Sequence, residues 1–142
     1  SRYVMAAKEA NAEVVVRITA DCPLLSPEVV DRVIRGLGIG RFDFASNAIK
    51  RTFQRGLDVE VAWRDTLERV NRLATSQPAR EHVFTYVYLE EPKLFLTRDV
   101  CDAEDNSGLS WTLDTVADLD HLRRIYDDEA DYKTLIARER AS

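Results

Sequence analysis

An almost continuously apolar segment, followed at once by a turn and an amphipathic helix, occupies the first quarter of the chain. Residues 13–19 read EVVVRIT, the kind of run needed by a strand that is covered on both faces. Ser26 and Pro27 then provide a helix cap and a first-turn residue. The apolar positions that recur at helical spacing are Val29, Val30, Val33, Ile34 and Leu37. A strand, a turn and a helix in this order indicate an α/β fold.

The same alternation of strands and helices continues to the end of the chain. Further strands are predicted at 42–46, 57–63, 94–100 and 109–113. Helices are predicted at 2–10, after a cap at Asp65, at 78–90, and after Thr115, where Asp118 completes a capping box. No repeat, low-complexity segment or linker divides the chain, so we expect a single domain over residues 1–142.

Composition excludes several classes of protein. The chain has 142 residues, of which 45% are hydrophobic and 32% charged, as in ordinary globular proteins. A net charge of -5 argues against a general nucleic-acid binder, although a local basic pocket for a phosphorylated small molecule is compatible with it. No apolar run has membrane-spanning length and no signal-peptide pattern is present, so we expect a cytoplasmic protein. Cys22 and Cys101 lie far apart without zinc-site spacing, and we expect both to be simple thiols.

Two aspartates follow predicted strands at junctions with helices. Asp21 comes after the strand at 13–19, and Asp114 comes at the end of the strand at 109–113. In open parallel sheets the ligand lies beyond the carboxyl ends of the strands, so these carboxylates converge if the two strands are neighbours. Mg²⁺ is commonly held by one or two carboxylates, with substrate phosphates and water as its other ligands. The alternative is that both aspartates only accept hydrogen bonds in turns near helix starts.

Arginines are further candidates for binding. Arg17 lies on an otherwise apolar strand, where a guanidinium needs a carboxylate, carbonyl groups or a phosphate. It is therefore either part of a structural ion pair or in contact with a ligand. Asn47, Arg51 and Arg55 lie in SNAIKRTFQRG, a predicted loop between two strands. Because arginine forks suit carboxylates and phosphates, this loop either holds an acidic sugar or its phosphates, or is simply solvated.

The remaining polar candidates each allow two interpretations. Asp58 and Glu60 share one strand face, either as paired acids for proton transfer or as the wet face of a half-exposed strand. His82 lies near a helix start, where it acts as a base or sugar contact, or is an ordinary surface histidine. His121 has charged neighbours and is expected at the surface, whereas Trp111 is expected in the core.

Four motifs occur in order along the chain: VVRITADCPLLSPEVVD, SNAIKRTFQRGLDVEV, REHVFTYVY and LSWTLDTVADLDHLRRIY. Together they resemble the cytidylyltransferases of spore-coat polysaccharide biosynthesis, a family similar to CMP-sialic acid and CMP-Kdo synthetases. The resemblance covers nearly the whole chain, and four ordered motifs are far more specific than any single one. It favours a metal-binding role for the two aspartates.

The resemblance implies a partial Rossmann-like, GT-A-like nucleotidyltransferase fold, a three-layer α/β sandwich. Asp21 in ADCPL and Asp114 in DTVADL match the family's metal-binding carboxylates, which implies Mg²⁺ and a catalytic role for both. The implied reaction is attack by a sugar hydroxyl on the α-phosphorus of CTP, releasing pyrophosphate, with the metal neutralising charge and aligning the reactants. The candidate substrate-binding residues are then Arg17, Asn47, Arg51, Arg55 and His82.

One part of the family pattern is missing. Such enzymes begin with a strand and a loop like ARMGSTRLPGK that cradles the triphosphate, and this sequence contains neither. We therefore expect residues 1–142 to form roughly the carboxyl-terminal two-thirds of a nucleotidyltransferase domain, as a truncated piece or a natural fragment. Two alternatives stay open. One is a non-catalytic module that contributes to a homodimer through LDVEV and REHVFTYVY, and the other is a nucleotidyltransferase that uses another NTP.

Overall fold

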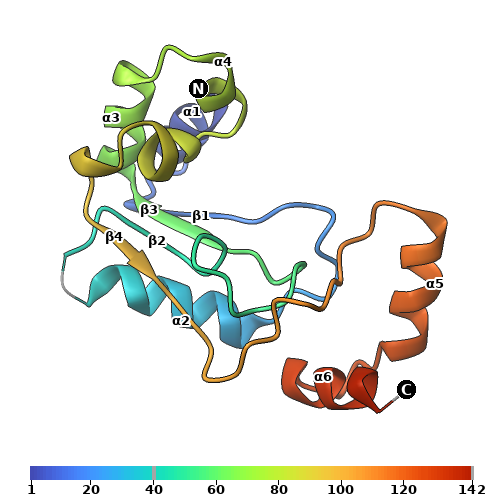
Figure 1. The fold of residues 1–142 in the computed structure, drawn as a ribbon. Coiled ribbons are helices and arrows are strands. Elements are labelled where there is room, and N and C mark those ends of the chain that lie inside the picture. Colours follow the sequence, from blue (N-terminus) through green and yellow to red (C-terminus); the bar gives the residue numbers. More distant parts are fainter. Residues whose placement is uncertain (40, 142) are drawn as a thin grey trace.

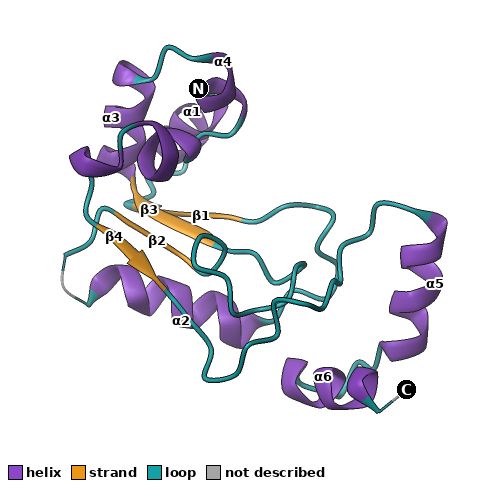
Figure 2. Cartoon of the chain, in the orientation of Figure 1, coloured by secondary structure: helices purple, strands orange, loops and turns teal. Residues whose placement is uncertain are grey.

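A computed structural model describes residues 1–39 and 41–141, and it contains a mixed sheet with helices on both faces (Figures 1 and 2). The helices are α1 (Arg2–Glu9), α2 (Pro27–Gly38), α3 (Arg64–Leu73), α4 (Gln77–Glu81), the π-helix η1 (Tyr86–Glu90), the 3-10 helix η2 (Pro92–Leu94), α5 (Val116–Ile125) and α6 (Tyr132–Arg140). The strands are β1 (Val14–Arg17), β2 (Phe44–Ser46), β3 (Glu60–Trp63) and β4 (Thr97–Asp99). No helix in the described part of the chain is both long and apolar enough to cross a membrane.

The sheet has the order β1-β3-β2-β4, with β3 antiparallel to its two neighbours and β2 parallel to β4. It is therefore mixed, and not fully parallel as the strand-end argument for the aspartates assumed. Because β1, β2 and β4 share one direction, their carboxyl ends still meet at a single end of the sheet. The amino end of β3 lies at that same end. The residues that precede β3 therefore lie near the carboxyl ends of the other three strands.

Two hydrophobic cores hold the layers together, one on each face of the sheet. Beneath the sheet in Figure 1, α2 packs against β2, β3 and β4, and its buried side chains join those of α5 and α6. On the other face, α1, α3, α4 and η1 form a helical layer over Phe44 and Ala62. The result is the three-layer α/β arrangement that the sequence predicts.

Most predicted elements are present, with several changes in extent. The helix after β3 begins at Arg64, so Asp65 lies inside its first turn instead of capping it. The helix predicted at 78–90 is divided into α4 and η1. The strand predicted at 109–113 is reduced to a single bridge between Ser110 and Arg55. α6 was not predicted from the sequence, although Asp131 caps it by accepting a hydrogen bond from the Thr134 N–H.

Candidate functional site

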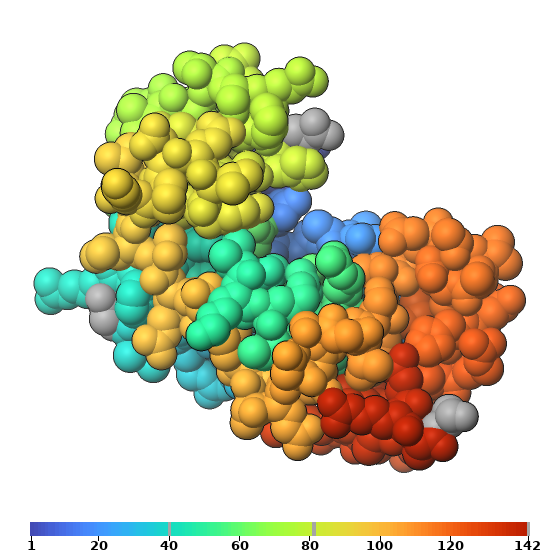
Figure 3. All heavy atoms as spheres, in the orientation of Figure 1, coloured from blue at the N-terminus to red at the C-terminus, as the bar shows by residue number. Residues whose placement is uncertain are grey.

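The surface is hollowed between the helical layer and α5, above β1 and the loop that follows it (Figure 3). A cavity of about 380 Å³ opens at the end of the sheet where β1, β2 and β4 finish. Its lining comes from β1, the loop after β2, the amino end of β3 and η1: Arg17, Thr19, Ala48, Ile49, Arg51, Asp58, Glu60 and Tyr88. Three of these residues, Arg17, Arg51 and Asp58, were singled out in the sequence as polar candidates, and a fourth, Glu60, was paired with Asp58.

Arg17 forms an ion pair across the sheet with Glu60. The two residues are register partners on β1 and β3, so their side chains leave the same face of the sheet. The Arg17 guanidinium also donates a hydrogen bond to the Tyr3 hydroxyl at 3.3 Å. Burial raises the pKa of the Glu60 carboxyl, and the charge of Arg17 opposes that rise. Of the two roles that the sequence allowed for Arg17, the structural ion pair is present, and the guanidinium still reaches the cavity wall.

Arg51 and Asp58 form a second, bidentate pair in the cavity lining. The two terminal nitrogens of Arg51 lie 2.5 and 3.0 Å from the two carboxylate oxygens of Asp58. Both side chains are partly exposed, so the pair faces the cavity. Neither Asp58 nor Glu60 thus belongs to a simple solvated strand face, because each carboxylate is held by an arginine.

Asn47 has a position that supports the backbone near the cavity. Its side chain is fully buried, and its carboxamide donates to the Leu57 carbonyl at 2.6 Å and accepts from the Val59 N–H at 2.8 Å. These bonds replace sheet pairing just before β3 and fix the chain that carries Asp58. Its predicted contact with substrate stays a prediction, and its observed contacts are with the backbone.

The loops that carry Asp21 and Asp114 lie side by side. The Leu113 N–H donates a hydrogen bond to the Asp21 carbonyl at 2.9 Å, which brings the residue before Asp114 against the turn after β1. Asp21 is half-buried, and the Cys22 thiol lies 3.8 Å from one of its carboxylate oxygens. Asp114 is exposed, and its N–H donates to the Asp118 carboxylate in the capping box of α5.

Asp21 and Asp114 are carboxylates of the kind that Mg²⁺ takes as ligands together with other oxygen donors. Neither Asp21 nor Asp114 is in an ion pair with another described residue. Among the side chains that the structure describes, no cluster of three or more His, Cys, Asp or Glu could hold a metal alone. Two carboxylates completed by phosphate oxygens and water are a common arrangement for Mg²⁺.

Cys22 contributes packing near this pair of loops. Its side chain is buried, and burial is the main cause that raises the pKa of its thiol, with the nearby carboxylates of Asp21 and Asp58 adding to the rise. A raised pKa disfavours the nucleophilic thiolate. The thiol of Cys22 is therefore a packing group, as the sequence indicated, and the carboxylates of Asp21 and Asp58 both lie within electrostatic reach of it.

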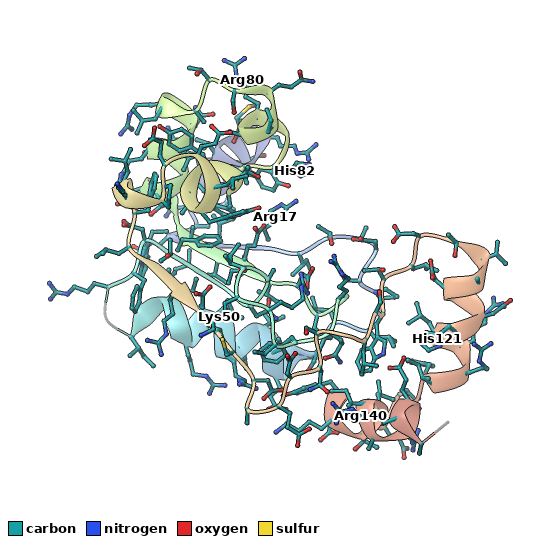
Figure 4. All side chains as sticks on the ribbon, viewed as in Figure 1. Arg17, Lys50, Arg80, His82, His121 and Arg140 are labelled. Carbon is teal, nitrogen blue, oxygen red and sulfur yellow. The ribbon has the colours of Figure 1, made fainter. Side chains whose placement is uncertain are left out.

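His82 and Arg55 are the remaining candidate substrate-binding residues, and they differ in their position relative to the cavity. His82 is exposed at the end of α4 (Figure 4), and burial raises the pKa of Glu60 while a charge on His82 opposes that rise. In the same figure its side chain and that of Arg17 lie on the same side of the hollow. Arg55 is exposed, and its backbone pairs with Leu109 and Trp111 at 3.1 and 2.8 Å, away from the cavity lining.

Three residues at the site were not singled out in the sequence, and the expectation for His121 was wrong. Tyr3, Thr19 and Tyr88 reach the site from α1, the turn after β1 and η1, and only the REHVFTYVY motif gave a signal for any of them. His121 is half-buried instead of free at the surface. Its Nε2 lies 3.0 Å from the Glu139 carboxylate, whose other oxygen accepts from the indole of the fully buried Trp111.

Comparison with known proteins gives one match in sequence and one in structure. No family model matches the chain. An uncharacterized protein of Methanocaldococcus jannaschii is 35% identical over 119 residues, which are 82% of this chain and 47% of that protein. A cytidylyltransferase from Leptospira borgpetersenii serovar Hardjo-bovis superposes with a TM-score of 0.90 at 30% identity, over 99% of this chain and 61% of that one. The chain thus has a cytidylyltransferase as a structural neighbour along its entire length, and it spans about half the length of the curated relative.

Proposed function

We propose that the chain belongs to a CTP-dependent nucleotidyltransferase that transfers the cytidylyl group to a sugar or sugar acid for surface polysaccharide biosynthesis, of the spore-coat type. The observation that carries this proposal is the end-to-end likeness to a solved cytidylyltransferase, combined with a polar cavity at the carboxyl ends of three strands. Pyrophosphate is the second product, because the α-phosphorus of CTP is the centre attacked.

Different residues of the chain would bind each of the two substrates. Asp21 and Asp114 lie on adjoining loops and would hold Mg²⁺, which would neutralise negative charge on the triphosphate. The cavity beside them presents Arg17 and Arg51, each already partnered by a carboxylate, to the sugar. A guanidinium held by a carboxylate is fixed in orientation, and its remaining N–H groups suit sugar hydroxyls or a sugar carboxylate.

His82 and Tyr88 extend this wall from the helical layer. Tyr88 lines the cavity from η1, and His82 lies at the end of α4. Both would contact the sugar, whereas Asn47 would act through the backbone of the segment before β3. Arg55 stays a predicted phosphate contact that faces solvent next to the cavity loop.

Calorimetric titration of CTP and Mg²⁺ into the chain tests the role of the two aspartates. We expect binding that requires Mg²⁺ and weakens at least about tenfold in both Asp21→Asn and Asp114→Asn, since each loses one charged metal ligand. Asp31→Asn is the matched control, because Asp31 is an exposed aspartate on α2 and should leave the affinity unchanged.

Different results contradict different parts of the proposal. Binding weaker than about millimolar, unchanged by Asp21→Asn, would mean that this chain alone is no enzyme and would favour the non-catalytic module. Equal binding of UTP or ATP would favour another NTP. For the module, the apolar side chains of LDVEV are unsuited to a dimer contact, since Leu57, Val59 and Val61 are fully buried within the chain.

The assembly predicted from the family resemblance is a homodimer in the cytoplasm. Sedimentation velocity at several protein concentrations tests the dimer directly. A single monomeric species over the whole concentration range would contradict it.

A further inference from the structure

The charged side chains that line the cavity at the end of the sheet cancel one another. Two of the lining residues are arginines and two are acids, and each arginine is held by one of the acids. Arg17 is paired with Glu60, and Arg51 is paired with Asp58. The part of the lining that the structure describes therefore presents no cation without a counter-charge.

Both pairs are shielded from water, so a ligand in the cavity meets carboxylates as well as guanidinium groups. All four side chains are mostly buried, and the most exposed of them is Asp58, at 31%. The bidentate contact with Asp58 occupies both terminal nitrogens of Arg51. His82 is exposed at the end of α4, outside this lining, where water and salt screen its charge.

The rest of the lining suits hydroxyl groups and an apolar ring face. Thr19 and Tyr88 contribute hydroxyls, each of which can donate and accept a hydrogen bond. Ala48 and Ile49 contribute apolar surface, and Ile49 is 42% exposed, so this surface is open to contact. An arginine paired with a carboxylate also places donors beside acceptors. A sugar hydroxyl can use both, whereas a carboxylate of a ligand can only accept.

We propose that the sugar bound in this cavity is uncharged, with no carboxylate or phosphate in the part of the ring that enters. An acidic group would have to lie beside Asp58 and Glu60, or displace one of them from its arginine. Either arrangement leaves a mostly buried negative charge without full compensation. The inference rests on the proposed function, because it takes the cavity as the sugar site, and it selects the neutral sugar over the sugar acid.

NMR titration of matched sugars into the isotopically labelled chain tests this preference. The pairs are glucose and glucuronate, galactose and galacturonate, and mannose and mannuronate. The members of each pair differ only by a carboxylate in place of a hydroxymethyl group. We expect the amide signals of Thr19 and Ile49 to shift with an uncharged sugar, with a Kd at least about tenfold lower than that of its acid.

Two results of this titration would overturn the proposal. The first is an acid that binds as tightly as its uncharged partner, in the pair that binds best. The second is the absence of amide shifts with every sugar, because the cavity would then not be a sugar site.

Two isosteric variants test the electrostatic reason for the preference. Asp58→Asn leaves Arg51 without its counter-charge, and Glu60→Gln does the same for Arg17. We expect each variant to strengthen binding of the acid at least about fivefold relative to its uncharged partner. Asp31→Asn, at an exposed position on α2, is the control and should leave this ratio unchanged. Unchanged ratios in both cavity variants, with amide spectra that show a folded chain, would contradict the proposal.

Binding of CTP decides a different question. Mg²⁺-dependent binding of CTP together with a preference for the sugar acid would leave the nucleotidyltransferase proposal intact and refute only the uncharged sugar. A preference for the uncharged sugar without any binding of CTP would support the assignment of the cavity and contradict the activity proposed for the chain.

Discussion

Removing the positive charge of Arg17 should destabilise the chain in a pH-dependent manner. Its side chain is 20% exposed and that of Glu60 is 11% exposed, so the pair is largely withdrawn from water. Breaking a buried pair by deleting one partner costs about 3–5 kcal/mol. The residual exposure of Arg17 reduces this value, and we expect Arg17→Gln to lower the free energy of unfolding by about 2–3 kcal/mol at pH 8.

The pH dependence follows from the pKa of Glu60. Burial raises this pKa above the ordinary value of 4.5, and loss of Arg17 raises it further. A raised pKa in the folded state gives a stability contribution that is fully present below the unfolded value and is lost as pH rises through the folded value. The variant should therefore be closer to the wild type at pH 5 than at pH 8, because the carboxyl of Glu60 is then more often neutral.

Urea unfolding followed by circular dichroism at pH 5 and pH 8 gives the required free energies. The set consists of wild type, Arg17→Gln, Glu60→Gln and the double variant. We expect Arg17→Gln to be rescued in part by Glu60→Gln, with a coupling energy of about 1–2 kcal/mol at pH 8. Additive losses, or a loss from Arg17→Gln that is the same at both pH values, would refute the account of Arg17 as the counter-charge of Glu60.

Three further substitutions, with Gly108→Ala as a control, test the loop between β2 and β3 that lines the cavity. Gly56→Ala should lower the free energy of unfolding by more than about 3 kcal/mol, because φ is +95° and a Cβ would lie 2.6 Å from the Trp111 carbonyl. In Gly108→Ala the added Cβ meets nothing within 4 Å, so thermal denaturation should show almost no change. Gln54→Leu should raise the free energy of unfolding by about 1 kcal/mol, because the buried amide of Gln54 has no hydrogen-bond partner in the described structure. If urea titration shows a lower free energy of unfolding instead, a bound water is the partner of this amide. Asn47→Ala should lower the free energy of unfolding by about 2–4 kcal/mol in the same titration, since two buried backbone groups lose their hydrogen-bond partner. A decrease below about 1 kcal/mol would contradict the role of Asn47 in holding the backbone before β3.

Elements that depend on local chemistry could be predicted from the sequence. α5 follows the capping box of Thr115 and Asp118, because caps act within a single turn of helix. α2 begins at Pro27 as predicted, but the Ser26 side chain makes no capping hydrogen bond, so the first-turn proline is the local signal that holds. α6 was missed although Asp131 caps it, since its apolar stripe is short and follows a run of acidic residues.

Strand direction and strand length could not be predicted in the same way. The alternation of LDVEVAW continues from Leu57, but β3 begins only at Glu60. The preceding residues are held by the side chain of Asn47, a contact that no periodicity reveals. The antiparallel direction of β3 follows from the path of the whole chain, which is a tertiary property.

The candidate site shows the same division between local and distant causes. The position of Asp21 after a strand was readable from the sequence, and the hydrogen bond between Leu113 and Asp21 brings Asp114 into its neighbourhood. The partner of Arg17 was not readable, because Glu60 is 43 residues away and only the register of β1 with β3 brings them together. Tyr88 was hidden for a similar reason, since it reaches the cavity from η1 in a separate layer.

The central position of β3 has a consequence for how the protein folds during synthesis. β3 lies between β1 and β2 in space but follows both in the chain, so neither strand has its neighbour until residue 63 has been made. At typical rates of translation, the apolar β1 segment waits several seconds for β3. Such non-local pairing is slow and leaves an unpaired apolar strand available for misassembly. The segment from Val14 to Ile18 is therefore an unpaired apolar strand in the nascent chain until β3 has been made.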